Sequence, residues 1–340
     1  QVLTDDKPFI VDSIKALLER YGIEIKVFLH PVISIKRSAA GDIQGITSDG
    51  SDESIICAVL HHVSHAVQKK LISEIDKILS KISLVLGARE KILERLEVVC
   101  AATKFRNEDV DFLDWLRDVR NFTFLGSLKY SISHEASGVL GDVAVYEADS
   151  VYLEDVMKCA ISEEGAALFL GKMNQISEVS TGKFVDYILV SSGKEATLFY
   201  GFYGSGLYNQ SIKHIPVLGN KLHYLLERSG FKREGYNYRK LRSIAESFPR
   251  EALFQIEAED LYCICLHILS AMMARTLKLF IQEDGSGEFL NVLIFMPIER
   301  LTPESHLAMC KYLTSKFNTK IVTDEISSST SKFCCLYLTL

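Results

Sequence analysis

No stretch of this 340-residue sequence approaches the roughly 18 consecutive apolar residues that a helix needs to cross a bilayer. The chain also has no excess of basic residues, because Lys and Arg number 38 against 44 Asp and Glu. Proteins that bind nucleic acid generally carry a positive field that releases counterions from phosphate. We therefore predict neither a membrane-spanning protein nor a nucleic-acid-binding protein.

Regular cysteine spacing is missing as well. The sequence contains eight cysteines, but they do not show the short, repeated spacing of a disulfide framework. No signal peptide is visible, although the sequence starts with Gln1 rather than with Met. Together these features indicate reduced thiols and a cytoplasmic protein.

The sequence lacks the motifs of common nucleotide and hydrolase sites. A dinucleotide site needs Gly-x-Gly-x-x-Gly between a strand and a helix. The nearest segment is Gly201 to Gly206, whose glycines stand in a different order, and we interpret it as a mobile surface loop. No Gly-x-Ser-x-Gly nucleophile elbow is present. We therefore expect no cofactor-binding residues and no catalytic residues in this chain.

One cluster of possible metal ligands includes Cys57, His61, His62 and His65. Thiolates and imidazoles at this density can bind zinc. Successive residues of a strand point to opposite faces, however, so His61 and His62 cannot easily bind one ion together. We predict no metal site, and the question whether His61, His62 and His65 bind an ion stays open.

Two other cysteine pairs are poor chelators. Cys263 and Cys265 lie two residues apart on a predicted helix, which places them on nearly opposite faces. Cys334 and Cys335 are neighbours in a predicted strand. We interpret all four as core thiols.

The composition and length of the chain predict a folded globular protein of more than one domain. Hydrophobic residues make up 48% of the chain and charged residues 24%, and 340 residues exceed the size of one typical core. In the first part of the chain, helical spacing from Phe9 to Tyr21 ends at Gly22, and alternating apolar residues follow. A second, long helix carries an apolar stripe from Leu71 to Val99. The resulting order of strand, helix, strand, strand and helix is most of a ferredoxin-like unit.

The start of the first helix is a candidate ligand site. In Asp5-Asp6-Lys7-Pro8 a carboxylate can cap free amides, and Pro is tolerated in a first helical turn. The turn from Thr4 to Phe9 also exposes amides that can hold a carboxylate ligand. An ordinary capped helix is the alternative, because every helix has such amides. We single out Asp5, Asp6, Lys7 and Pro8 as candidate residues for a regulatory ligand.

The rest of the chain alternates strands and helices. In the middle, we expect strands over Val185–Val190 and Ala196–Tyr203 and helices over Leu218–Arg228 and Tyr238–Phe248. In the last part we expect, in order, helix Leu261–Leu277, strands Leu279–Ile281 and Phe289–Met296, helix His306–Phe317, and strands Lys320–Thr323 and Phe333–Leu340. This last order again suggests an α/β plait.

Several motifs resemble the large NAD-specific bacterial glutamate dehydrogenases. The resemblance begins at Asp5-Asp6-Lys7-Pro8-Phe9-Ile10-Val11-Asp12-Ser13 and covers nearly the whole chain. Further matching motifs are, in order, His30-Pro31-Val32, Phe112-Leu113-Asp114-Trp115-Leu116, residues 121–126, Asp186-Tyr187-Ile188, residues 215–255 and residues 278–300.

The resemblance implies an α+β fold. The N-terminal region of such enzymes is similar to a set of ACT-like domains joined by helices. We therefore expect tandem ACT-like domains with the ferredoxin-like βαββαβ order, antiparallel sheets and long connecting helices. The expected domains are residues 1–104, residues 105–260 with helical insertions, and residues 261–340, the last one truncated.

The resemblance also implies a function. It identifies the chain as an N-terminal regulatory and assembly region of an enzyme that converts L-glutamate, NAD and water to 2-oxoglutarate, NADH and ammonium. NAD is then the cofactor of the parent enzyme, and the catalytic lysines and the NAD-binding domain lie farther along the same polypeptide. The implied partners are this catalytic region, further copies in a homo-oligomer and an amino-acid effector. The alternative is a stand-alone ACT-type module for amino-acid sensing or protein interaction.

One residue departs from the pattern that ACT ligand sites resemble. Such sites are similar to Asp-x-Pro-Gly, and Phe9 stands where the glycine would be. A bulky side chain restricts the approach of a ligand to the backbone at this point.

Overall fold

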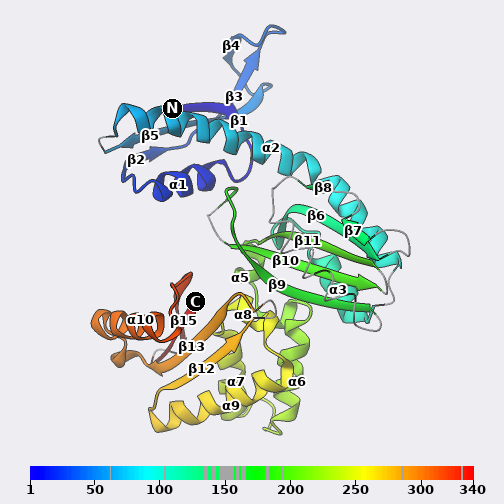
Figure 1. Cartoon of the computed structure of the whole chain (residues 1–340), viewed down its shortest axis with the longest axis vertical. Helices are drawn as coiled ribbons and strands as arrows, with labels where there is room; N and C mark the ends of the chain where they lie inside the picture. The colour runs from blue at the N-terminus through cyan, green and yellow to red at the C-terminus, as the bar shows by residue number, and fades with distance from the viewer. Residues whose placement is uncertain are drawn as a thin grey trace. The chain divides into compact units, whose positions relative to one another are not determined.

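The computed structural model describes residues 1–61, 63–102, 105–132, 137–139, 143–144, 157, 161, 166–180, 184–192, 195–284, 287–330 and 332–340. The chain forms two compact units (Figure 1). The first unit contains Gln1–Ile92, Val143–Ala144 and Asn174–Val185, and the second contains the described residues from Leu93 to Val139 and from Met157 to Met173, and Asp186–Leu340. The domain boundaries after residues 104 and 260 stay predictions. Within the described ranges, no helix combines the length and the apolar character needed to cross a membrane.

The first sheet belongs to the first unit and is antiparallel. Its strands are, in spatial order, β1 (Val2–Asp5), β5 (Ser51–Leu60), β3 (Val32–Arg37) and β4 (Ile43–Ile46), and β2 (Ile25–Leu29) also pairs with β5. β2 and β3 are two parts of one strand path interrupted at Pro31, which lacks a backbone donor. β3 and β4 pair with each other on either side of Gly41.

Two helices complete this part of the chain. α1 (Ile10–Arg20) buries Ile10, Ile14 and Leu17, and Gly22 leaves the helix with a φ of 64°. α2 (His65–Ala102) is a single helix of 38 residues. With β2 and β3 counted as one strand, the structure contains the predicted order of strand, helix, strand, strand and helix, but it adds β4, which was not predicted.

The second sheet lies in the middle of the chain. Its strands are, in spatial order, β7 (Ser137–Val139), β6 (Phe122–Ile132), β11 (Glu195–Tyr203), β10 (Phe184–Ser192) and β9 (Ala166–Ile176). A further short strand is β8 (Val143–Ala144). The predicted pair of strands at Val185–Val190 and Ala196–Tyr203 is confirmed as β10 and β11, which run antiparallel. The sequence patterns did not predict β9.

Helices precede and follow this sheet. They are α3 (Asn107–Trp115), α5 (Ser205–Asn209), the 3₁₀ helix η1 (Ile212–His214), α6 (Leu218–Arg228), α7 (Tyr236–Glu246), α8 (Arg250–Gln255) and α9 (Ala258–Ala274). α6 has the predicted bounds, and α7 begins and ends two residues before the prediction. α8 was not predicted.

The third sheet closes the chain and is antiparallel. Its strands are, in spatial order, β12 (Lys278–Glu283), β13 (Leu290–Pro297), β15 (Phe333–Thr339) and β14 (Thr323–Thr330). The 3₁₀ helix η2 (Ile298–Arg300) and α10 (Pro303–Phe317) connect β13 to β14. The prediction of a strand at Lys320–Thr323 is wrong in its position, because β14 begins at Thr323. Thr302 and Ser305 form a reciprocal capping box that fixes the start of α10.

Candidate functional site

The predicted ligand residues lie at the end of β1 and in the turn that leads to α1, and the side chains of Asp5, Asp6 and Lys7 have partners within the first unit. The Asp6 carboxylate accepts a hydrogen bond from Ser54 Oγ at 2.5 Å, and the Asp6 N–H donates to the Asp52 carbonyl. Lys7 Nζ donates to Ser83 Oγ on α2 at 3.1 Å and lies 3.4 Å from the Asp5 carboxylate. The expectation that a carboxylate caps α1 is wrong, since the N-cap residue is Phe9 and it receives no side-chain cap. Pro8 is exposed and directly precedes this N-cap.

Phe9 adopts a left-handed backbone conformation, with φ 74° and ψ −10°. This conformation costs an L-residue about 1–2 kcal/mol, and glycine adopts it without that cost. The turn thus keeps the backbone conformation that favours glycine while carrying a half-buried phenylalanine.

The predicted histidine cluster is only partly described. His61 is exposed and its Nε2 lies 3.2 Å from the Glu24 carboxylate, while His65 is the first residue of α2. His62 lies outside the described residues. Cys57 is half-buried on β5.

The other cysteines were predicted to be core thiols. Cys265, Cys334 and Cys335 are buried, which confirms the prediction for these three. Cys263 is exposed, so the prediction is wrong there. The cause is the spacing on α9, which turns Cys263 away from the face that buries Cys265.

The glycine-rich segment from Gly201 to Gly206 is packed, so its interpretation as a mobile surface loop is wrong. The N–H of Gly204 donates to the Asn121 carbonyl at 2.8 Å, and the N–H of Gly206 donates to the Arg120 carbonyl at 2.6 Å. A Cβ at position 204 would lie 2.4 Å from the Arg120 carbonyl oxygen. These glycines therefore allow two backbones to approach, and their amides are already used.

A buried ionic cluster, which sequence patterns did not reveal, lies in the second unit. Lys172 Nζ on β9 lies 2.9 Å from the Asp186 carboxylate on β10 and 2.7 Å from the Glu251 carboxylate on α8. The Tyr208 hydroxyl donates to the other oxygen of Glu251 at 2.5 Å. The Lys172 side chain is only 10% exposed and that of Asp186 only 7%. No motif marks these residues, because they come from four separate elements, with Tyr208 on α5.

The electrostatics of this cluster fix its protonation. Burial alone lowers the pKa of Lys172, but the carboxylates of Asp186 and Glu251 outweigh it, and the pKa lies above its ordinary value. Burial and the Glu251 carboxylate both raise the pKa of Tyr208. Lys172 therefore stays a protonated ammonium, which is not a nucleophile or a base. The arrangement can hold β9, β10 and α8 together.

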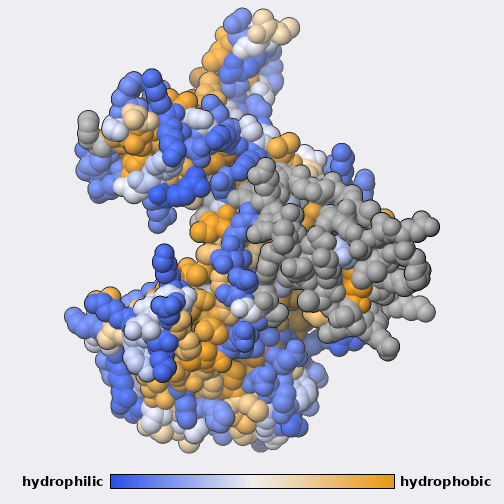
Figure 2. Space-filling model, in the orientation of Figure 1, coloured by the Kyte–Doolittle hydropathy of each residue, from blue (hydrophilic) through white to orange (hydrophobic). Residues whose placement is uncertain are grey.

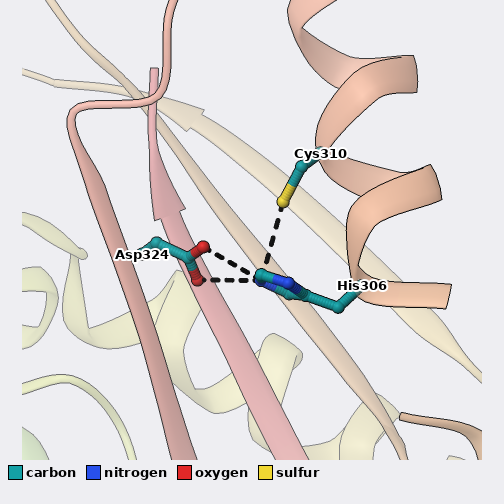
Figure 3. A group of neighbouring side chains, drawn as sticks. All are labelled: His306, Cys310 and Asp324. Carbon is teal, nitrogen blue, oxygen red and sulfur yellow. Dashed lines mark hydrogen bonds and ion pairs between the residues drawn. The ribbon is translucent and has the colours of Figure 1, made fainter. Parts of the chain in front are cut away.

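A second polar group lies on the third sheet, where α10 faces β14. His306 Nε2 lies 3.0 and 2.9 Å from the two carboxylate oxygens of Asp324, and Cys310 Sγ lies 3.6 Å from the same nitrogen (Figure 3). One atom from each residue lies within 4.8 Å of the other two. Burial raises the pKa of the Cys310 thiol, and the Asp324 charge raises it further. Sequence reasoning missed this group, although the i, i+4 spacing of His306 and Cys310 on a predicted helix was a signal.

One face of the first sheet is apolar and exposed. Residues paired directly across antiparallel strands point to the same face. The pairs Leu3–Ile55, Leu29–Cys57 and Val27–Val59 therefore share a face. Four of these side chains are exposed: Leu3 at 48%, Val27 at 46%, Leu29 at 58% and Val59 at 55%. We call this set the open face: Leu3, Val27, Leu29, Ile55, Cys57 and Val59.

The opposite face of the first sheet bears a helix. Phe28 pairs with Ala58, so both point away from the open face. The Lys15 ammonium on α1 lies 4.8 Å from the centre of the Phe28 ring. α1 therefore packs on the face opposite to the open face.

The third sheet differs because helices contact both of its faces. Leu313 of α10 packs with Val292 and Ile294 on one face. On the other face, the Phe248 and Phe295 rings lie 5.3 Å apart and Asn291 donates to Gln255. Every residue of β15 is buried.

The edge of the third sheet is less completely covered. On β12, Leu279 and Ile281 are 47% and 44% exposed. Figure 2 shows hydrophobic residues gathered over this part of the sheet. In the first sheet the exposed apolar residues extend over three strands, β1, β2 and β5, whereas here they lie on one edge strand.

Three family models match the chain. Residues 1–77 match the ACT1 domain of glutamate dehydrogenase, residues 215–273 match helical motif 1 of glutamate dehydrogenase, and residues 278–340 match its ACT2 domain. The first match covers the first sheet and α1, and the third covers the third sheet and α10. The fold prediction of tandem ACT domains with antiparallel sheets and helices between them is confirmed.

Curated relatives carry the same family name. The chain is 27% identical to an NAD-specific glutamate dehydrogenase of Pseudomonas aeruginosa and 24% identical to one of Halomonas elongata, in each case over 93% of this chain and 22% of the relative. It is 21% identical to one of Mycobacterium tuberculosis, over 93% of this chain and 20% of the relative. The chain thus spans about one fifth of the length of the relatives it matches. With matches to the ACT1 domain, helical motif 1 and the ACT2 domain in order, the chain is homologous to an N-terminal region of NAD-specific glutamate dehydrogenases.

Proposed function

We propose that this chain is the regulatory and assembly region of an NAD-specific glutamate dehydrogenase. The parent enzyme would convert L-glutamate, NAD and water to 2-oxoglutarate, NADH and ammonium, with NAD bound by a catalytic region elsewhere on the same polypeptide. The names and greater length of the relatives support this proposal. They also make a stand-alone sensing module the less favoured alternative.

The open face is the observation that carries the assembly role. Four of its six side chains are large, apolar and about half exposed, although they lie together on one sheet. Contiguous exposed apolar surface costs free energy in water and typically marks a protein interface. In the ACT2 domain (residues 278–340) the corresponding sheet is covered, because helices contact both of its faces. The open face would dock against the catalytic region or against another copy in a homo-oligomer.

The experiment places a charge in this face. We expect Leu29→Glu with Val59→Glu, made in the glutamate dehydrogenase that contains this region, to lower the sedimentation coefficient or the rate of NADH formation. Val32→Glu is the matched control, because Val32 is 46% exposed on β3 and pairs with Ser54, which places it on the face opposite to the open face. Unchanged assembly and unchanged activity in the double variant would remove the basis of the proposal.

The catalytic role is assigned to the parent enzyme and not to this chain. The isolated 340-residue chain is therefore expected to form no NADH from glutamate and NAD. Turnover by the isolated chain, measured at 340 nm and abolished by heat, would contradict this assignment.

The segment from Asp5 to Pro8 remains the candidate site for a regulatory ligand. An amino-acid effector at Asp5, Asp6, Lys7 and Pro8 would stabilise the native chain by mass action and raise its melting temperature. A thermal-shift screen of the chain against the common amino acids tests this. Because the Asp6 carboxylate and the Lys7 ammonium already have partners in the turn, absence of any shift would leave assembly as the role.

The thiols support a reducing compartment. All seven cysteines in the described ranges are free, and several are buried in the cores. Free thiols are the norm where glutathione and thioredoxin keep cysteine reduced. We propose a cytoplasmic location on this basis.

A further inference from the structure

His306, Cys310 and Asp324 bring three different ligand atoms together on the third sheet. His306 and Cys310 are four residues apart on α10 and therefore share one face of the helix. Asp324 is the second residue of β14, and its carboxylate faces the imidazole (Figure 3). Of all the side chains whose positions are described, this is the one group of at least three His, Cys, Asp or Glu residues with converging ligand atoms.

We propose that His306, Cys310 and Asp324 form a binding site for a divalent transition-metal ion of the zinc class. The site would supply one nitrogen, one sulfur and one oxygen ligand. Three protein ligands leave the fourth position of a tetrahedral ion for water or another ligand. This site goes beyond the regulatory and assembly role and does not depend on it.

The observed distances fit such an ion. Zinc binds thiolate sulfur at about 2.3 Å and imidazole nitrogen at about 2.0–2.1 Å, so the two atoms are about 3.5 Å apart around a tetrahedral centre. Cys310 Sγ and His306 Nε2 are 3.6 Å apart. The nitrogen and a carboxylate oxygen would be about 3.3 Å apart by the same geometry. Asp324 is closer, at 2.9–3.0 Å, so its carboxylate would have to move by a few tenths of an ångström.

Protonation accounts for this shorter distance. In the absence of metal, one proton between His306 Nε2 and the carboxylate makes the 2.9 Å contact a hydrogen bond or ion pair. Metal binding at Nε2 would leave one imidazole proton, on Nδ1, and any second imidazole proton would go to solvent together with the Cys310 thiol proton. No redox change is involved.

The ligand set selects the class of metal. Calcium and magnesium prefer oxygen ligands only, whereas a thiolate with an imidazole favours zinc and its neighbours among the transition metals. Access also fits, because the His306 and Asp324 side chains are 28% and 37% exposed while Cys310 is buried. An ion would thus reach the site from the solvent side, and Cys310 Sγ would bind it from the buried side.

Metal binding would link two elements of the ACT2 domain. Cys310 belongs to the apolar core beneath α10, together with Leu313, Ile294 and Leu336. Asp324 lies on the edge strand β14. An ion held by both elements would fix α10 on the sheet and raise the melting temperature of the chain.

Cobalt titration of the whole 340-residue chain tests the proposal, because Co²⁺ replaces zinc and is coloured. We expect one equivalent of Co²⁺ to give thiolate-to-cobalt absorption in the near ultraviolet and intense visible bands typical of a tetrahedral site. Zinc should displace the cobalt and raise the melting temperature. Cys310→Ser should abolish the near-ultraviolet band, and Asp324→Asn should weaken binding by about tenfold or more.

The controls separate this site from incidental metal binding. Cys263→Ser removes an exposed thiol in the same unit and should leave both the spectrum and the stoichiometry unchanged. Circular dichroism checks that each variant is folded, and the exposed Asp324 provides a variant that does not disturb the core. Absence of stoichiometric binding in the wild-type chain, or equal binding in Cys310→Ser and Asp324→Asn, would overturn the proposal. In both cases the His306–Asp324 contact would be only an ion pair between helix and strand.

Discussion

At the scale of single residues, Lys172 is a buried charge that depends on two carboxylate partners in the second unit. Its ammonium group is buried between two carboxylates, at 2.9 Å from Asp186 and 2.7 Å from Glu251. Removing one partner of a buried ion pair leaves uncompensated charge and typically costs about 3–5 kcal/mol. We expect Lys172→Met to lower the free energy of unfolding by this amount in urea titrations.

Lys129 provides the matched control for that measurement. It makes a pair with Glu195 at 3.0 Å, but both side chains are well exposed, at 38% and 53%. Exposed pairs contribute about 0–1 kcal/mol, so Lys129→Met should change stability little. Similar losses in the two variants would show that Lys172 is not held as described.

Gly204 gives a second prediction at this scale. A Cβ there would lie 2.4 Å from the Arg120 carbonyl oxygen, and backbone cannot move aside cheaply. We expect Gly204→Ala to destabilise the chain by about 1–3 kcal/mol, as overpacking usually does. Gly45→Ala should be close to neutral, since nothing lies within 4 Å of its Cβ position. Equal unfolding midpoints for the two variants would contradict the packed arrangement.

Residue patterns in the sequence drew attention to some of the candidate sites and not to others. The turn of Asp5 to Pro8 was found because a carboxylate pair before a proline and an apolar helix is a local signal. The Lys172 cluster was not, because β9, β10 and α8 are brought together only by folding. The trio of His306, Cys310 and Asp324 lies between these cases. Its helical pair is visible in the sequence, but Asp324 joins it through the pairing of β14.

At the scale of elements, Lys221 determines how α8 ends. Its ammonium donates to the carbonyls of Leu253 and Phe254 at 2.9 Å and of Ile256 at 2.7 Å. The last carbonyls of a helix have no partner within the helix, and a cation there satisfies them. Burial lowers the pKa of Lys221 to about 8.

The lowered pKa gives a prediction with a definite sign. In the unfolded chain Lys221 returns to its ordinary pKa of 10.5, so the unfolded state binds more protons between about pH 8 and 10.5. The contribution of Lys221 to the free energy of unfolding therefore rises with pH across that window and is constant below it. Measured as the difference in unfolding free energy between wild type and Lys221→Met, the contribution should grow from about pH 7.5 to about pH 10. A difference between wild type and Lys221→Met that falls as the pH rises would contradict the assignment.

Elements with strong local signals were predicted well. α6 and the β10–β11 hairpin combine clear apolar periodicity with a glycine stop or turn, and their predicted positions agree with the structure. β9 and α8 were missed, because their apolar residues follow neither period clearly over enough length. β14 was misplaced for a related reason, since most of its residues are Ser and Thr and its position depends on pairing with β15.

At the scale of the whole molecule, the sequence indicated the family more readily than the mechanism. Many short motifs in a fixed order pointed to glutamate dehydrogenase, and three family models and the relatives agree with them. What an ACT domain binds, however, depends on a few atoms of one turn or one surface. Here the left-handed backbone conformation of Phe9 and the exposure of the open face became visible only in the structure. The motifs could not predict either feature.

The different covering of the two ACT sheets has a consequence for amide hydrogen exchange. In β13 and β15 nearly every residue is buried, whereas no residue of β1 or β2 is buried. We expect the amides of β13 and β15 to take up deuterium only when their unit unfolds globally, and those of β1 and β2 to exchange through local opening. Exchange followed by mass spectrometry checks this, and slower uptake in β1 than in β15 would contradict it. If β1 and β2 exchange more slowly in a full-length glutamate dehydrogenase than in this chain, the difference would locate, strand by strand, the surface that the proposed partner covers.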